Sequence, residues 1–394
     1  MSFDIALSGI NAVNAQLDTI SNNIANSGTY GFKSSRVNFT STYAGMQSTG
    51  SEVGSITQSL DAGGSVLTTG RDMDVAIQDR GFFVSRDTTG NLLYSRVGIF
   101  SKDKDGYVVD SANNRVQGFA AIPNSTTLGA MGDLQVPTGQ IAASASTRMK
   151  YTGNLSSGWV APAVAFDPAD PQSFNGSMVS VVYDSLGAQH SVTQYFVKTG
   201  TNQVTVHYTS DGAPVAGTNV LDFDTLGNLS SPAAPVPVGL PTPTGAAAFA
   251  LTMDYAGTTQ YAGEATTSAN SADGYASGTL IGVQVTDEGQ VMAKYSNGQK
   301  QSVGTVALAT FPDEGALTAV SGTSWAASNA SGTPLYFSPG SGMAGTLTSG
   351  AVEQSNVDIT AELVGLMSAQ RNYQANAKVI STENQMVQAL MQAV

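Results

Sequence analysis

The two ends of the chain carry a pattern that restricts the fold more than any other feature. From Ile359 onward, apolar side chains recur in alternating steps of four and three residues, which is typical of an α-helical coiled-coil seam. This register contains Ile359, Leu363, Leu366, Gln370, Tyr373, Ala377, Ile380, Asn384, Val387, Met391 and Val394. Near the start, the same pattern contains Phe3, Leu7, Ile10, Asn14, Leu17, Ser21 and Ile24. The sequence therefore predicts one seam-bearing helix at each terminus.

The C-terminal helix carries a second apolar stripe beside its seam, made of Val379, Met386, Leu390 and Ala393. A helix that is apolar on more than one face needs more than one neighbour. One interpretation is an antiparallel helix pair that closes the chain on itself, but the second stripe favours further packing against other copies of the protein. The polar seam positions would then fix the register at some cost in stability. Ser355 and Asp358 are expected to form a capping box at the start of this helix.

Composition narrows the classes of function. Charged residues make up 11% of the 394 residues, against about 25% in a typical domain, and small polar residues favour strands and turns. The net charge of −13, with Lys and Arg scattered, argues against nucleic-acid binding. The absence of Cys excludes disulfides and thiolate metal sites. We expect no membrane insertion and no ordinary secretory signal, because no apolar run approaches ~20 residues and the start lacks a basic region.

Between the predicted helices, short apolar runs separated by Gly, Asn and Asp clusters predict antiparallel strands. The expected strands are 74–78, 81–86, 92–100, 107–110 and 115–122, then 177–184, 189–198 and 203–209, and finally 280–286, 291–295 and 301–310. Residues 210–247 are dominated by Pro, Gly and Ala, which predicts loop or edge. Residues 34–70 have few large apolar side chains, which predicts an extended linker.

The order of these segments indicates a chain that runs outward and returns. The predicted fold class is a multidomain, mainly β protein with α-helical coiled-coil termini, in which discontinuous β domains are nested and the two terminal helices are paired at one end. The predicted parts are a helical domain of residues 1–28 and 356–394, an extended connector of 29–70 and 325–355, an inner β domain of 71–145 and 271–324, and an outer β domain of 146–270.

Two motifs beside the predicted seams are specific enough to indicate a family. At the end of the first helix stand Asn22, Asn23, Ile24, Ala25 and Asn26, followed by Thr29, Gly31, Phe32 and Lys33. The last helix carries Gln370, Arg371, Tyr373 and Gln374. Both motifs, in this order and at these ends, resemble the rod, hook and hook-associated proteins of the bacterial flagellum. The resemblance is strong over residues 1–145 and 270–394 and poor between them.

The resemblance implies a structural subunit without enzymatic activity. Chain length and the large middle insert favour the hook, a flexible helical tube that transmits torque from rod to filament, with the apolar seam residues joining its copies. The implied partners are other copies of the chain, the distal rod protein, the hook cap, the hook–filament junction protein and the type III export apparatus, which would place the protein outside the cell. Phe39 and Tyr43 resemble an element proposed to engage the export gate, although a packing role explains them equally well.

Two other interpretations stay open on the sequence alone. One is the distal rod protein, which has the same terminal motifs but lacks so large an insert. The other is a secreted β-rich adhesin or enzyme that its helices merely dimerise.

Several patterns suggest catalysis or metal binding, but their surroundings do not fit. Residues 340–345 spell G-x-G-x-x-G, yet Thr and Gly follow where a dinucleotide site needs a helix. Asp103, Asp105 and Gly106 lack the other ligands of a calcium loop. His190 and His207 have no companion Cys or His for a zinc site. The sequence therefore predicts no catalytic, cofactor or metal site.

Overall fold

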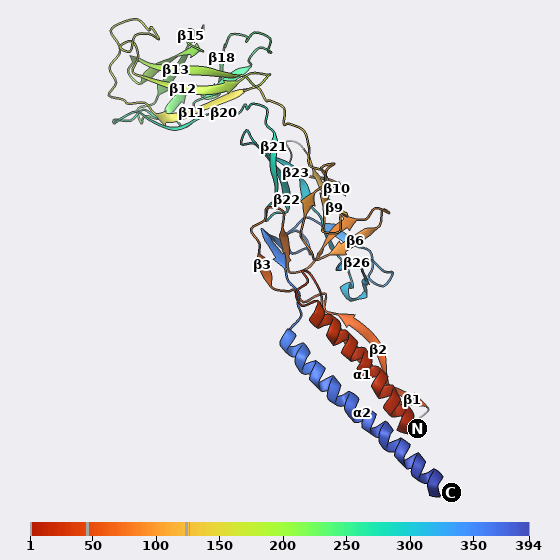
Figure 1. The fold of residues 1–394 in the computed structure, drawn as a ribbon. Helices are drawn as coiled ribbons and strands as arrows, with labels where there is room; N and C mark the ends of the chain where they lie inside the picture. Colours follow the sequence, from red (N-terminus) through yellow and green to blue (C-terminus); the bar gives the residue numbers. More distant parts are fainter. Residues whose placement is uncertain (1, 45–46, 123–124, 126, 394) are drawn as a thin grey trace. The chain divides into compact units, whose positions relative to one another are not determined.

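The computed structural model describes residues 2–44, 47–122, 125 and 127–393, and they form two compact units. The helix unit takes in the chain up to Thr138, Gly282–Lys294, and the chain from Lys300 onward. The sandwich unit consists of Gly139–Ile281 and Tyr295–Gln299. Strands predominate in both, and a long helix lies at each terminus (Figure 1). The predicted fold class is confirmed, whereas the finer four-part division stays a prediction.

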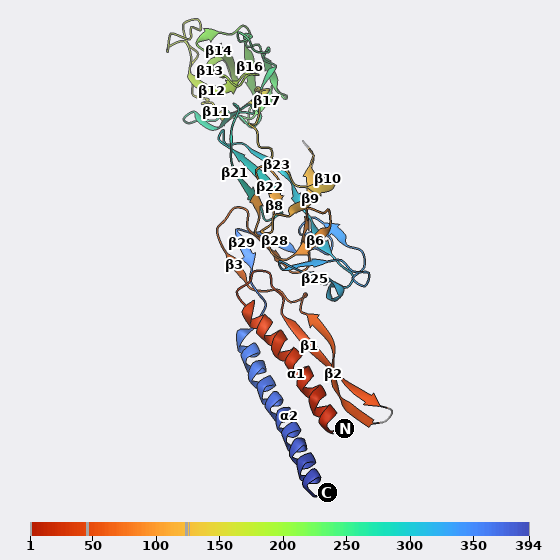
Figure 2. The ribbon, with the colours of Figure 1, turned by 45° about the vertical axis from the view of Figure 1, so that its right-hand side comes forward.

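The terminal helices α1 (Ser2–Ala25) and α2 (Ile359–Ala393) run antiparallel in the helix unit. A side-chain bond joins Asn23 to Glu362, Gly365 lies against Ile20, and Gly9 lies against Asn376. The residue numbers of such partners have a constant sum of 385, so Ser2 is level with Glu383. Residues 384–393 of α2 therefore extend past the start of α1, as Figures 1 and 2 both show.

Residues 35–58 correct the expectation of an extended linker. They form a long antiparallel hairpin of β1 (Ser35–Ala44) and β2 (Gln47–Gln58) beside α1 (Figure 2). The Ser8 hydroxyl accepts a bond from the Ser51 amide at 3.2 Å, and Val37 is buried. The sequence conceals this hairpin because Ser, Thr and Gly dominate it, and α1 rather than a strand alternation supplies its partner surface.

The β part of the helix unit is built mainly on one large sheet with the order β21-β22-β23-β9-β5-β6-β26-β25 and with β7, β8, β10, β24 and β27 on its sides. The bounds are β5 (Phe82–Arg86), β6 (Leu92–Ser95), β7 (Ser101–Lys102), β8 (Val108–Val109), β9 (Arg115–Ala121), β10 (Leu128–Asp133), β21 (Leu280–Val285), β22 (Gln290–Tyr295), β23 (Lys300–Val306), β24 (Leu308–Thr310), β25 (Thr318–Val320), β26 (Ser324–Ala326) and β27 (Leu335–Phe337). Its core centres on Phe82, Tyr94, Phe311 and Trp325.

Two small sheets connect this body to the returning chain. β3 (Val66–Thr68) pairs with β29 (Ala351–Glu353), and β4 (Val75–Gln78) pairs with β28 (Thr346–Ser349). A 3-10 turn, η1, spans Glu314–Ala316. Residues 325–355, also expected as connector, thus supply strands β26 to β29. Segments far apart in sequence lie side by side here, which is the outward-and-return path that the element order predicts.

The sandwich unit encloses its own core between two sheets. One sheet has the order β18-β19-β11-β20, and the other β12-β13-β14-β16-β17 with β15 on β14. The bounds are β11 (Arg148–Asn154), β12 (Gly176–Tyr183), β13 (Gln189–Gly200), β14 (Gln203–Ser210), β15 (Ala213–Pro214), β16 (Asn219–Phe223), β17 (Leu229–Ser231), β18 (Val236–Val238), β19 (Leu251–Asp254) and β20 (Thr266–Ala272). Met149, Tyr151 and Met253 meet Phe196 and Val206 in this core.

The predicted strands lie within one or two residues of observed ones, with three corrections. Residues 92–100 form β6, a bend at Arg96 and an isolated bridge at Ile99, and residues 301–310 divide into β23 and β24. The predicted loop at 210–247 contains β15 to β18. These strands are short, and β15 and β18 carry Pro, so the sandwich core stabilises them more than their own propensity does.

Candidate assembly surface and the joint behind it

The contact between α1 and α2 uses the flank of each predicted seam. Val13, Ile20 and Ala369 are buried there, with Leu17, Ile24 and Leu366 packed against them. This face is offset from the predicted registers because small residues set the approach of the helices. A methyl group at Gly9 would come within 2.8 Å of Asn376, and one at Gly365 within 3.4 Å of Ile20.

The predicted seam residues therefore divide into two groups in a single chain. The half-buried group consists of Ile10, Leu17, Ile24, Leu366, Ala377 and Ile380. The exposed group consists of Phe3, Leu7, Ile359, Leu363, Tyr373, Val387 and Met391. The polar positions Asn14, Ser21, Gln370 and Asn384 are also exposed, so they do not lie in the α1–α2 contact.

The overhanging end of α2 concentrates the exposed apolar surface. Leu390 and Met391 are 66% and 73% exposed, and Met386 and Val387 are exposed beside them. Val379, in the second stripe, is exposed as well. The side chains of Ala393 and Val394, which the sequence also places in the two stripes, lie outside the described residues. Contiguous exposed apolar side chains of this kind are typical of protein–protein interaction surfaces.

The start of α2 corrects one local prediction. The Asp358 carboxylate accepts bonds from the amides of Thr360 at 2.9 Å and Ala361 at 3.2 Å. Asp358 is therefore the N-cap itself, whereas the Ser355 hydroxyl accepts a bond from the Val357 amide. The expected capping box, with Ser355 as the cap, is wrong by three residues because the helix begins later than that motif requires.

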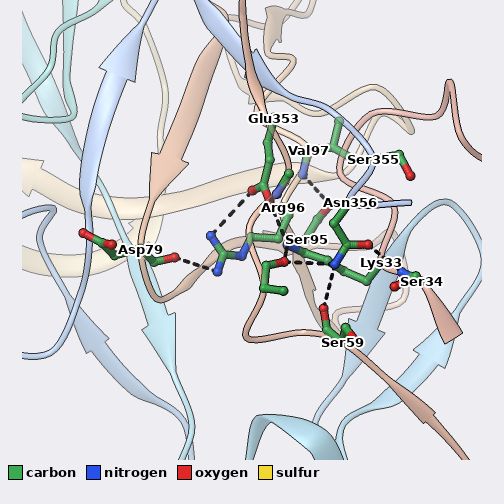
Figure 3. A network of polar contacts seen from close by, with 12 residues as sticks. Lys33, Ser34, Ser59, Asp79, Ser95, Arg96, Val97, Glu353, Ser355 and Asn356 are labelled. Carbon is green, nitrogen blue, oxygen red and sulfur yellow. Dashed lines mark hydrogen bonds and ion pairs between the residues drawn. The ribbon is translucent and has the colours of Figure 1, made fainter. Parts of the chain in front are cut away.

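A buried ionic cluster lies between the segment that follows α1 and the segment that precedes α2 (Figure 3). Lys33 Nζ is 2.7 Å from Glu353 Oε1 and donates a second bond of 2.7 Å to the Ala62 carbonyl. Arg96 Nη1 is 3.5 Å from Glu353 Oε2, and Arg96 Nη2 donates to the Asp79 carbonyl at 2.7 Å. The side chains of Lys33, Arg96 and Glu353 are each 1% exposed.

Burial dominates the electrostatics of this cluster. It lowers the pKa of Lys33 and of Arg96, and the Glu353 charge opposes that effect in both cases. Removing Glu353 would leave Lys33 and Arg96 as uncompensated buried cations, which is far more costly than the net gain of forming the pairs. The cluster therefore fixes how residues 33, 96 and 353 meet, and we call this region the joint.

Two amide side chains complete the joint. Asn23, at the end of α1, donates to the Ser35 carbonyl at 2.8 Å and to Glu362 Oε1 at 2.7 Å, and it accepts from the Ser35 amide. Asn356 accepts a bond from the Ser34 amide at 2.7 Å and donates to the Ser59 carbonyl at 3.0 Å. The outgoing and returning chain segments are thus held together just where the helices begin and end.

The first family motif forms one wall of the joint. Asn23 and Lys33 make the hydrogen bonds described above. Gly31 has a φ of +66°, and a side chain there would collide with Val97. Asn26 bonds to Asn22 and accepts from Thr29, Ile24 packs between the helices, and Phe32 is half-buried while Ala25 is exposed. Sequence reasoning missed Arg96 and Glu353, and their only signal is charge within an apolar stretch.

The remaining predicted residues lie on open surface. Gln370, Arg371, Tyr373 and Gln374 of the second motif are exposed along α2. Phe39 and Tyr43 are exposed on β1.

The patterns that mimic catalytic or metal sites have structural explanations. Residues 340–345 form a turn that leads into β28, so the helix of a dinucleotide site does not follow. The Asp103 carboxylate accepts hydrogen bonds from the backbone amides of Asp105 and Tyr107 across a tight turn. His207 stacks on Phe166 with ring centres 4.0 Å apart, whereas His190 lies between two carboxylates rather than alone. Within the described residues, no three possible ligands are grouped for a metal ion, and none of the described helices has the length and apolar character to cross a membrane.

Four family models match the chain, and together they define a class, the axial proteins of the flagellar rod and hook. The "Flagella basal body rod protein" model matches residues 3–33, and the "Flagellar hook protein FlgE/F/G D1 domain" model matches 76–146. The "Flagellar basal body protein FlaE D2 domain" model matches 154–275, and the "Flagellar basal body rod FlgEFG protein C-terminal" model matches 348–393.

Relatives of full length narrow this class. The chain is 38% identical to flagellar hook protein FlgE of Salmonella typhimurium strain LT2, over 99% of both chains, and 36% identical to that of Escherichia coli strain K12, also over 99% of both. It is 31% identical to that of Treponema pallidum strain Nichols, over 98% of this chain and 97% of the relative. The chain belongs to the flagellar hook protein family.

A solved structure agrees at the level of fold. The crystal structure of Helicobacter pylori flagellar hook protein FlgE2 matches with a TM-score of 0.52 and 13% sequence identity, covering 73% of this chain and 99% of that one. Because the relatives of full length are hook proteins, the rod and adhesin interpretations are not favoured, and the family is a structural one.

Proposed function

We propose that copies of this chain polymerise into the flexible helical tube of the hook, which passes torque from the rod to the filament. The observation that carries the proposal is the set of apolar side chains on α1 and α2 that stay exposed among the described residues. Phe3 and Leu7 lie at one end of α1, and Val387, Leu390 and Met391 lie on the overhang of α2.

The overhang of α2 and the joint end of the helix pair differ in shape and sequence, which favours a heterologous contact between copies. The overhang of α2 has no α1 segment level with it, whereas the joint end has both helices and the hairpin. A contact between unlike surfaces does not close on two copies and generates a helical assembly. Complete burial of Leu390 or of Met391 in such a contact would contribute roughly 1.5–3 kcal/mol per side chain to the free energy of assembly.

The same proposal extends to partners and place. The two ends of the tube would present the two unlike surfaces to different neighbours, namely the distal rod protein on one side and the hook cap or the hook–filament junction protein on the other. Passage through the flagellar type III export apparatus would bring the chain outside the cell, and Phe39 and Tyr43 are its candidate contacts there.

The sandwich unit would supply the compliant contacts of a bending tube. Its surface is rich in Ser, Thr, Gly and Asn, and hydrated polar contacts exchange at small cost because bridging water replaces direct hydrogen bonds. A bulky apolar residue at such a contact should stiffen the hook, and unchanged bending of variant hooks in motile cells would count against this part of the proposal.

A paired substitution tests the assembly surface. Leu390→Ser with Met391→Ser removes apolar area from the overhang without altering any described contact. We expect loss of tubes by electron microscopy and monomers by sedimentation. Leu226→Ser is the matched control because Leu226 is 74% exposed on a turn of the sandwich unit. If the double variant forms tubes as readily as the control, the overhang is not the assembly surface.

A further inference from the structure

A histidine in the sandwich unit bridges two turns by way of two carboxylates. His190, at the start of β13, places Nδ1 2.7 Å from Asp211 Oδ2 and Nε2 3.5 Å from Asp184 Oδ2. Asp184 stands in the turn between β12 and β13, and Asp211 follows β14. The third neighbour is the Phe249 ring, edge-on with ring centres 5.7 Å apart. The titratable groups facing His190 in the described chain are therefore these two carboxylates.

Each carboxylate uses its other oxygen to hold a turn. Asp184 Oδ1 accepts bonds of 2.9 Å from the amides of Leu186 and Ala188. Asp211 Oδ1 accepts a bond of 2.8 Å from the Ser191 amide. Burial raises the pKa of Asp184, but the bonds from the two backbone amides and from His190 outweigh it, so that the pKa is lowered. The bond from His190 and then the Ser191 amide lower the pKa of Asp211, with burial opposing them. Both aspartates are thus acceptors with no proton to offer.

This arrangement is satisfied only by a doubly protonated imidazole. A neutral imidazole carries one N–H, so either Nδ1 or Nε2 would turn a lone pair toward a carboxylate. The short contact to Asp211 is the hydrogen bond, whereas the contact of 3.5 Å to Asp184 is ionic in character and depends on the positive charge. The bond to Asp211 raises the pKa of His190, with burial opposing and Asp184 reinforcing the effect.

The turn that Asp184 holds braces the two segments by which the chain enters and leaves this unit. A methyl group at Gly187 would come within 2.8 Å of Ala143 and 3.3 Å of Ala276. Next to the turn, Tyr183 and Ser146 exchange two bonds of 2.9 Å. Residues 141–144 and 275–278 are themselves bridged, so we call these two segments the neck.

We propose that His190 is a proton-operated clamp, whose charged imidazole ties the turn 184–188 to Asp211 and so keeps the neck of the sandwich unit braced. The stabilisation is complete below the unfolded pKa of histidine and is lost as pH rises through the raised pKa of folded His190. The clamp does not rest on the assembly proposal, because every group in it belongs to one chain.

The full-length monomer allows a direct test because the chain has only two histidines. Proton NMR titration of the two imidazole signals, assigned with His190→Gln and His207→Gln, should give a midpoint above the ordinary value for His190. His207 is the internal control, since burial lowers its pKa and no carboxylate faces it among the described residues. Asp184→Asn should lower the His190 midpoint and leave that of His207 unchanged.

Hydrogen exchange then reports the mechanical consequence. After correction for intrinsic rates, amides in the turn 184–188 and the neck should exchange about threefold to fivefold faster above the His190 midpoint than below it. His190→Gln should exchange fast at both pH values, and His207→Gln should behave as the wild type. Equal corrected rates on both sides of the midpoint, or a normal His190 midpoint, would overturn the clamp.

Discussion

The sandwich unit and the terminal helices differ in where their apolar side chains find partners. In the sandwich unit, two sheets of one chain cover Met149, Phe196 and Met253 completely or nearly so. On the terminal helices, Val387 and Met391 stay exposed although they belong to the same regular pattern as the packed Leu366. The first region is covered as one chain folds, whereas the second keeps apolar side chains exposed, and we propose that another copy covers them. A pattern of apolar residues thus predicts burial without saying in which molecule the cover lies.

The strongest way to break this comparison is to remove residues 359–394. The truncated chain should lose all assembly, because the overhang and the whole α1–α2 contact are gone, while the sandwich core keeps its aromatic packing. Sedimentation measures the first outcome and near-ultraviolet circular dichroism the second. Loss of the aromatic signal together with the helix would show that α2 is an ordinary core element.

The converse change weakens the complete region. Phe196→Ala removes a 2% exposed ring that packs on Tyr151 with centres 5.0 Å apart, and it should cost about 3–5 kcal/mol of unfolding free energy. Below the lowered unfolding transition, assembly should persist. Calorimetry measures the loss of stability and electron microscopy the assembly. Leu226→Ser serves as the control for a surface change in the same unit. Loss of tubes at temperatures where the variant is folded would contradict the division.

The joint between helices and β body should respond to a single methyl group. Gly64→Ala would place a carbon 1.9 Å from the Gln354 carbonyl oxygen, beside the Glu353 cluster, whereas Gly63→Ala has only Glu353 Oε1, at 3.9 Å, within 4 Å. Such overpacking costs about 1–3 kcal/mol, so denaturant unfolding should separate these neighbouring variants. Equal stability of the two would mean that the returning chain is not held at Gly64.

The smallest expected effect concerns the start of α2. Asp358→Ala removes the acceptor for two helix amides and should cost ~1 kcal/mol, while Asp358→Asn keeps the cap and should be close to neutral. The loss should appear as a higher concentration threshold for assembly, because α2 must be helical to present its overhang. If Asp358→Ala and Asp358→Asn assemble at the same concentration threshold, the helix cap does not contribute to assembly.

The sequence predicts the strands and helices well and their partners less well. Alternating apolar and polar residues predict β12 to β14 correctly because, within one chain, one face of each strand packs on the core and the other faces outward. The helix contact was displaced from the predicted seam because Gly9, Gly365 and Ala369 decide how closely the helices approach, and a pattern of large apolar residues overlooks them. The hairpin was missed because α1 covers it, and the pairing of Lys33 with Glu353 could not be predicted across 320 residues.

That pairing has a consequence for the order in which the molecule can be finished. Bringing together groups so distant along the chain requires closing a very large loop, and such contacts form late. Lys33 cannot find Glu353, nor Asn23 its bond to Glu362, until nearly the whole polypeptide is present. The N-terminal residues of the joint therefore find their partners only after the C-terminal residues are present. A chain that ends before residue 353 cannot form the joint.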